Sequence, residues 1–300
     1  MAKKNNCIGF VEVNTNNVTV LLPISDKEPH LRKDGQFNQG YFNILDFSII
    51  HSMLNSDLIQ AMDIIDKVAI GKAILKIEQY TPASHIMEVD EKLDGDNWAC
   101  INSDTGITCP NRVSSSDVCP FCNHCYAFKN CRNPSSLKKQ LAKMVFFHDN
   151  STDNLATEII NKGSTVVRIN QEGEFNSLMD YLKFVSLANK LPDVSFYGYT
   201  KNQIVLDYIA QNGLPKNLII NNSLGNWADT NYIAVKPSEI AHYLKLGYLL
   251  CKGSCANCRQ CLTKANKVTI LRDGTQKISV RDLAHMNHSE QLKFFEAEYL

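Results

Sequence analysis

The sequence has no long apolar run and no excess of charge of either sign. No stretch approaches the roughly 18 consecutive apolar residues of a membrane-spanning helix, and the first residues lack the apolar core of a secretory signal. Lysine plus arginine and aspartate plus glutamate both number 31, so the composition carries no electrostatic footprint for nucleic acid or an anionic membrane. We therefore expect a cytoplasmic protein that does not enter a membrane.

Cysteine, in contrast, is abundant and clustered. Of the 11 cysteines, five lie between residues 109 and 131 and four between residues 251 and 261. Disulfides are rare in the reducing cytoplasm, so clustered cysteines there are more often metal ligands than cross-links. The two clusters therefore predict two metal sites.

The first cluster contains three thiols at two-residue spacings, Cys119, Cys122 and Cys125. A tight loop with this spacing can wrap three corners of an iron–sulfur cube. Cys109, in a polar stretch before the loop, is the expected fourth ligand, with Cys131 as its substitute. We predict a [4Fe-4S] cluster held by Cys109, Cys119, Cys122 and Cys125.

The second cluster supplies four thiols within eleven residues, from Cys251, Cys255, Cys258 and Cys261. These are enough for a complete [4Fe-4S] set. Zinc is the alternative at both sites, because tetrahedral four-cysteine sites are common. Zinc sites usually pair two separated C-x2-C knuckles, whereas each cluster here has at least three thiols at consecutive short steps, which favours a cube.

The apolar pattern divides the chain into three parts. Residues 7–23 read as a β-hairpin around a polar tetrapeptide, and residues 43–54 and 57–77 have helical spacing. Further along, short strand-like runs alternate with amphipathic helices, which argues for a parallel α/β sheet, open or curled into a full or partial TIM-type (β/α) barrel. The predicted strands are 165–170, 194–200, 217–222, 232–235 and 268–271, and the predicted helices are 134–147, 152–161, 177–191, 203–211 and 237–247. We expect an N-terminal extension (1–100), a cysteine-cluster barrel domain (101–275) and a helical tail (276–300).

In such folds the chemistry lies at the carboxyl ends of the strands. Glu174, Lys201 and Lys236 each follow a predicted strand and are the candidate catalytic residues. The alternative is that they are ordinary solvated loop residues.

Several segments carry a family resemblance: residues 108–110, 122–127, 168–175, 196–201 and the cysteines at 251–261. Over roughly residues 105–275 the chain resembles the phage gene product 88 family, a group similar to radical S-adenosylmethionine enzymes. Cys125, Tyr126 and Ala127, closing a cysteine triplet ahead of a strand–helix series, also resemble that superfamily, although its usual spacing is C-x3-C-x2-C.

The resemblance implies a cofactor site. In radical S-adenosylmethionine enzymes a Gly-Gly-Glu segment holds the amino group of the cofactor, and Glu172-Gly173-Glu174 stands at the corresponding place. Glu174 is then the amine-binding carboxylate, with Asn170 and Arg168 as further cofactor-binding residues. A cluster with three ligands would bind S-adenosylmethionine at its open iron, whereas one with four would only carry electrons. Because five cysteines lie between residues 109 and 131, we favour a cluster with four cysteine ligands.

The sequence thus predicts an iron–sulfur protein with two [4Fe-4S] sites that performs redox or radical chemistry on an unknown substrate, with an electron-donor protein as its partner. Because Cys251, Cys255 and Cys258 have the C-x3-C-x2-C spacing, an inverted assignment with the second cluster as the catalytic one stays open. The competing hypothesis is a non-enzymatic, zinc-stapled module that binds nucleic acid or a protein partner.

Overall fold

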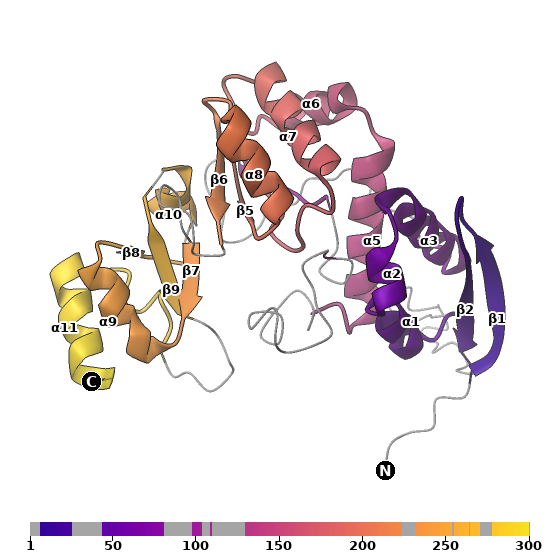
Figure 1. Ribbon diagram of the computed structural model, residues 1–300, viewed down its shortest axis with the longest axis horizontal. Helices are drawn as coiled ribbons and strands as arrows, with labels where there is room; N and C mark the ends of the chain where they lie inside the picture. The colour runs from indigo at the N-terminus through magenta and orange to yellow at the C-terminus, as the bar shows by residue number, and fades with distance from the viewer. Residues whose placement is uncertain are drawn as a thin grey trace, which may run out of the picture. The chain divides into compact units, whose positions relative to one another are not determined.

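The computed structural model describes residues 7–25, 44–80, 98–103, 109, 130–223, 232–253, 255–263, 265–270 and 278–299 (Figure 1). The chain divides into two units. The first comprises Met1–Ile86, Asn102–Ser151 and Glu172–Ser177, and the second Met87–Ile101, Thr152–Gln171 and Leu178–Leu300. Each unit is described by itself.

The first unit combines a hairpin with helices. Its described elements are β1 (Cys7–Asn14), β2 (Thr19–Ser25), α1 (Phe47–Leu54), α2 (Asp57–Ala61), α3 (Ile64–Ile77) and α5 (Pro134–Asp149). The two strands pair antiparallel around a turn in which the backbone N–H of Thr15 donates to the carbonyl of Val18 at 2.8 Å. The residues that cap the N-termini of α1, α3 and α5 are Asp46, Asp63 and Asn133. Their side chains accept hydrogen bonds from N–H groups of the first turn. The predicted hairpin is confirmed.

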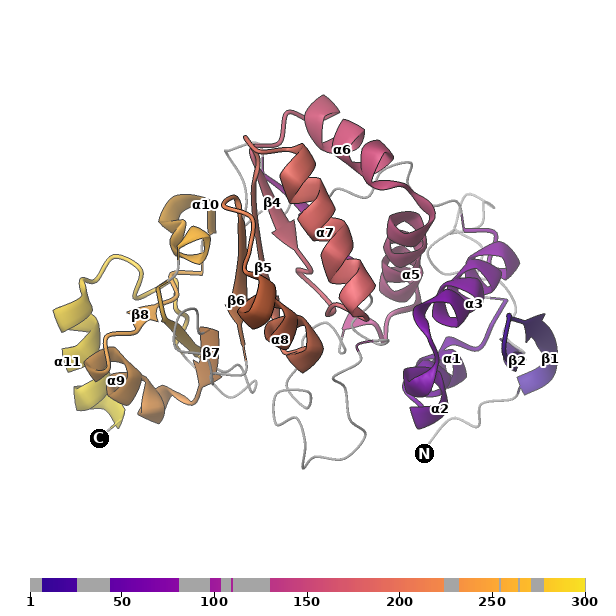
Figure 2. The same cartoon turned by 45° about the horizontal axis from the view of Figure 1, so that its top comes forward.

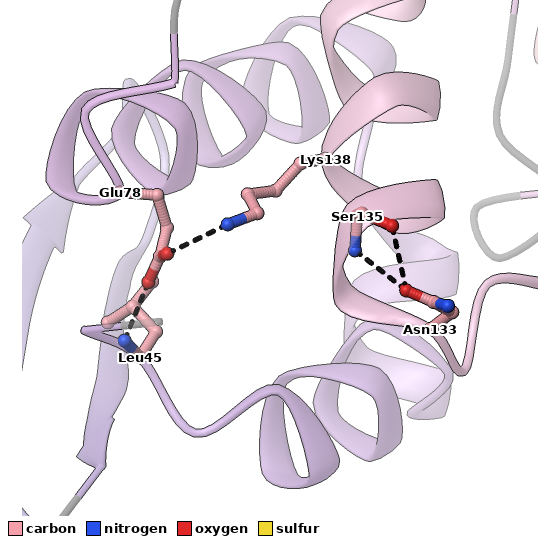
Figure 3. A network of polar contacts seen from close by, with 5 residues as sticks. All are labelled: Leu45, Glu78, Asn133, Ser135 and Lys138. Atoms are coloured by element: carbon pink, nitrogen blue, oxygen red, sulfur yellow. Dashed lines mark hydrogen bonds and ion pairs between the residues drawn. The ribbon is translucent and has the colours of Figure 1, made fainter. Parts of the chain in front are cut away.

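The core of the first unit encloses a buried ion pair. α3 packs against α5, and the two helices share one apolar cluster with the inner side of β2. Lys138 on α5 donates to Glu78 at 3.2 Å, and both side chains are at most 1% exposed. The other carboxylate oxygen of Glu78 accepts from the backbone N–H of Leu45 at 2.7 Å (Figure 3). The three residues therefore tie α5, the end of α3 and the entry to α1 together.

The second unit contains two parallel sheets. Its strands are β3 (Trp98–Ile101), β4 (Val166–Ile169), β5 (Ser195–Thr200), β6 (Leu218–Asn222), β7 (Tyr232–Val235), β8 (Leu249–Leu250) and β9 (Lys267–Ile270). The first sheet has the order β3-β4-β5-β6 and the second the order β7-β9-β8, with parallel pairs throughout. Its helices are α6 (Thr152–Asn161), α7 (Leu178–Lys190), α8 (Gln203–Asn212), α9 (Pro237–Lys245), α10 (Cys255–Cys258) and α11 (His288–Tyr299), and η3 (Gln260–Leu262) is a 3-10 turn.

The two faces of the four-stranded sheet differ in chemistry. Figure 2 shows α7 and α8 along one side of β4–β6 and α10 toward the other. Successive side chains of a strand point to opposite faces, and residues paired in a parallel register share a face. Arg168 pairs with Tyr197, and Tyr199 pairs with Asn221, so one face of the sheet carries polar and aromatic side chains. The opposite face is apolar, with Val167, Ile169, Phe196, Leu218 and Ile220 buried.

The structure confirms the α/β class with parallel strands. Each predicted strand and helix of residues 134–271 is present within a few residues of its expected ends. Two strands were not predicted: β3, whose four residues are all buried and have no alternation, and β8, which has only two residues. The described strands pair as two separate sheets and do not trace a closed barrel. The predicted domain boundaries at residues 100 and 275 stay predictions.

No helix among the described residues is both long and apolar enough to span a bilayer. This agrees with the absence of a long apolar run from the sequence.

Candidate metal centre

The second cysteine cluster is a short, turn-rich segment at the end of the three-stranded sheet. The backbone N–H of Cys251, directly after β8, donates to the carbonyl of Val268 on β9 at 2.8 Å. Cys255 and Cys258 begin and end α10, and Cys261 lies in η3. Arg259, between them, has a positive φ of 49°, so the chain reverses sharply here. The segment thus returns four thiols to one region of the second unit.

This segment packs on the polar face of the four-stranded sheet. η3 contacts both β5 and β6. Cys261 is buried in one cluster with Trp98, Cys100, Val166 and Tyr197, and Cys255 packs against the same cluster. The cysteine segment therefore covers the face opposite α7 and α8.

Three tyrosines adjoin three of the four thiols. The hydroxyl of Tyr199 donates to Sγ of Cys261. The phenol of Tyr197 lies beside Cys255, and that of Tyr232 beside Cys251. The ring of Tyr199 lies 6.2 Å from that of Tyr197 and 4.7 Å from that of Tyr232, centroid to centroid. Burial raises the pKa of all three phenols, so each stays protonated, and the hydroxyl of Tyr197 is buried without a hydrogen-bond partner among the described residues.

The thiols influence one another electrostatically. Burial raises the pKa of Cys261 to about 12, opposed by the hydrogen bond from Tyr199 and supported by negative charge on Cys251 and Cys255. Burial also raises the pKa of Cys258, with contributions from the same two thiols. Negative charge on Cys251 or Cys255 therefore disfavours ionisation of Cys258 and Cys261.

A buried lysine faces the thiols. Lys267, the first residue of β9, has no exposed surface, and its Nζ donates to Oδ1 of Asn221 at 2.6 Å and to the carbonyl of Thr263 at 3.1 Å. Burial lowers the pKa of Lys267, while Cys261, Cys251 and Cys258 act in the opposite direction. Lys267 could not be predicted as a site residue, since nothing near a single lysine at the start of a strand marks it as part of a site.

None of these four cysteines forms a disulfide. Among the residues that the structure describes, no group of three or more His, Cys, Asp or Glu side chains is arranged to hold a metal ion. The four thiols are thus gathered in one region, but they do not form a finished ligand cage.

A family model described as Gene product 88 matches residues 97–248, slightly more than half of the chain. The chain belongs to the gene product 88 family. No curated protein sequence and no solved structure matches it. The predicted phage family is therefore confirmed, and the likeness to radical S-adenosylmethionine enzymes stays a prediction.

The part that defines the gene product 88 family contains the first cysteine cluster and ends before the second, whose first member is Cys251. Cys119, Cys122 and Cys125 lie outside the described residues. Cys109 is half-buried, and Cys131 is buried in the apolar core of the first unit. The choice between Cys109 and Cys131 as fourth ligand stays a prediction.

The Glu172-Gly173-Glu174 segment, also within the family region, lies in the first unit. Gly173 has a φ of 97°, a conformation that L side chains rarely adopt. The carboxylate of Glu172 accepts from Asn130 at 3.3 Å and from Gln140. Glu174 is buried, and its carboxylate accepts from the N–H of Phe175 at 2.9 Å.

The other predicted site residues lie in the second unit. The guanidinium of Arg168 lies 5.8 Å from the centroid of the Tyr199 ring, so Arg168 belongs to the face covered by the second cysteine cluster. Asn170 is buried at the end of β4 with a φ of 49°. Lys201 follows β5 and is half-buried, and Lys236 is exposed at the start of α9, where its N–H donates to Glu239 at 2.9 Å.

Proposed function

We propose that this chain is an iron–sulfur protein in which Cys251, Cys255, Cys258 and Cys261 bind a [4Fe-4S] cluster. The observation that carries the proposal is the hydrogen bond from Tyr199 to Cys261, with the phenols of Tyr197 and Tyr232 beside Cys255 and Cys251 and a buried lysine nearby. Hydrogen bonds and positive charge directed at thiolates are what a cluster with four cysteine ligands requires of its surroundings. Metal binding would draw the thiols together, because metal sites of this kind seldom exist fully formed without the metal.

A bound cluster of this type supplies one-electron transfer. The protein contributes the thiolates, the hydrogen bond from Tyr199 and a sheet face against which Cys261 is buried. We further propose a second [4Fe-4S] site at Cys109, Cys119, Cys122 and Cys125, so that the two sites serve redox or radical chemistry on a substrate that receives electrons from a donor protein.

The predicted (β/α) barrel is part of this proposal. β3, β4, β5 and β6 are parallel and adjacent in chain order, and α7 and α8 follow β4 and β5. Successive strands of a barrel have this order, whereas a doubly wound sheet reverses it.

Anaerobic iron and sulfide analysis after reconstitution tests the proposal. The wild-type chain should hold about eight irons with matching sulfide, and Cys258→Ala should lose about four of each while the other site remains. Cys7→Ala, on the hairpin of the first unit, is the matched control and should lose none. Unchanged iron in Cys258→Ala would exclude this site, and zinc without sulfide would favour the zinc-stapled module.

A further inference from the structure

Lys267 and Asn221 form a buried polar connection between the second sheet and the cysteine segment. Both side chains are fully buried, and they belong to strands of different sheets, β9 and β6. The lysine Nζ donates to Oδ1 of Asn221, and Nδ2 of Asn221 donates in turn to the carbonyl of Cys261 at 3.3 Å and to that of Gly198 at 3.1 Å.

The same lysine also holds the cysteine segment directly. Its second acceptor is the carbonyl of Thr263, two residues after Cys261. Lys267 therefore fixes two carbonyls of one turn, that of Thr263 by its own hydrogen bond and that of Cys261 through Asn221. The position of the Cys261 thiol depends on this turn.

The charge of Lys267 has no carboxylate partner among the described residues. A buried ammonium is costly for a fold, and an apolar side chain of similar volume is often more favourable. The acidic groups near Lys267 are the thiols of Cys261, Cys251 and Cys258. A buried ammonium beside three thiols suits a state in which those thiols are ionised, as metal ligands are.

We propose that Lys267, acting with Asn221, is a positioning residue of the metal site: it fixes the turn that bears Cys261 and supplies the positive charge that offsets the thiolate ligands. This inference rests on the proposed function, but it holds for any metal that the four thiols bind.

Titration of the metal-free protein with Co2+, followed by thiolate-to-cobalt absorption, tests the inference. Lys267→Met should weaken Co2+ binding roughly 10- to 100-fold, as the loss of a supporting residue around a metal site does. Thermal unfolding of the same metal-free variant should show that it still folds, because removal of the buried charge offsets the lost hydrogen bonds to Asn221 and Thr263. Lys216→Met, at an exposed lysine of the same unit, is the control and should bind as the wild type does.

Asn221→Asp serves as a second variant if Lys267→Met does not fold. It leaves the ammonium in place but pairs it with a carboxylate and removes the donor to Cys261, so Co2+ binding should weaken as well. The Co2+ that the wild type binds in excess of Cys258→Ala reports this site. Retention of that excess at wild-type affinity in both variants would overturn the inference and leave the metal site standing. Equal Co2+ binding by the wild type and Cys258→Ala would overturn the metal site and the inference together.

Discussion

The hydroxyl of Tyr199 donates a hydrogen bond to the sulfur of Cys261, across 62 residues of sequence. Tyr199 lies on β5 and Cys261 in η3, so this contact fastens the cysteine segment to the four-stranded sheet. It is also the contact that lowers the pKa of the Cys261 thiol against the effect of burial.

Tyr199→Phe should therefore keep the fold and raise the pKa of the Cys261 thiol. The ring contacts with Tyr197 and Tyr232 remain, and loss of one hydrogen bond should reduce the free energy of unfolding by about 1 kcal/mol. Urea denaturation measures the stability, and iodoacetamide labelling with mass spectrometry should show slower reaction of Cys261. Tyr208→Phe, on α8, is the control, and equal labelling in both variants would contradict the assigned donor role.

The alkylation of Cys261 should depend steeply on pH. Its pKa of about 12 keeps the thiol protonated at neutral pH in the metal-free protein, so its labelling rate should still rise about tenfold per pH unit between pH 9 and 11. The labelling rate of added glutathione, whose thiol has an ordinary pKa, should level off in this range. Because folding disfavours the thiolate, the metal-free protein should lose stability as pH rises from 9 toward 12. Labelling of Cys261 that levels off with glutathione would contradict the burial of this sulfur.

The Glu78–Lys138 pair makes a different prediction for the first unit. Lys138→Met should destabilise it by about 3–5 kcal/mol, because the carboxylate of Glu78 is left buried without its partner. Glu78→Gln combined with Lys138→Met should restore most of that loss, since the glutamine oxygen still accepts from Leu45 N–H. Urea denaturation of the single and double variants measures both, and additive losses would argue against a coupled pair.

The pH dependence of the same pair has a defined sign. Burial raises the pKa of Glu78 above its ordinary 4.5. The folded state then binds a proton more tightly than the unfolded state, so the stability contribution of Glu78 falls as pH rises from 4.5 through the raised pKa. Thermal unfolding from pH 4.5 upward should show this loss of stability in the wild type and not in the Glu78→Gln, Lys138→Met double variant.

Gly198 should not accept a side chain. A Cβ there would lie 3.0 Å from Cβ of Ile169 on the neighbouring strand and 3.3 Å from its carbonyl oxygen. Gly198→Ala should destabilise the second unit by about 1–3 kcal/mol through overpacking. Gly9→Ala, where the nearest atom would be at 3.7 Å, is the matched strand control. Equal denaturation midpoints for the two variants would show that β4 and β5 can separate.

Any binding of S-adenosylmethionine should depend on Glu174. Its carboxylate is the predicted partner of the cofactor amine, so Glu174→Ala should abolish binding in equilibrium dialysis without loss of iron. Glu12→Ala, an exposed glutamate of β1, should bind as the wild type does. Equal binding before and after the Glu174 change would remove this residue from the site.

The sequence by itself determined the local structure and the supply of ligands. The alternation of β1 and β2 and the apolar spacing of α7 and α8 are local patterns, and each predicted its element. The spacing of Cys251, Cys255, Cys258 and Cys261 supplies four thiols in one segment, and the metal that they bind stays a prediction. The missed strand β3 is short and buried on both faces, so its signal is the parallel pairing with β4 rather than any alternation of its own.

Only the tertiary structure decided what surrounds the thiols. The aromatic residues of β5 have no local feature that marks a site, yet the parallel register places Tyr197 and Tyr199 on the face that the cysteine segment covers. Lys267 meets Asn221 across 46 residues, between strands of different sheets. Contacts of this kind arise from pairing and burial over long sequence separations, and the residues on either side of each partner carry no trace of them.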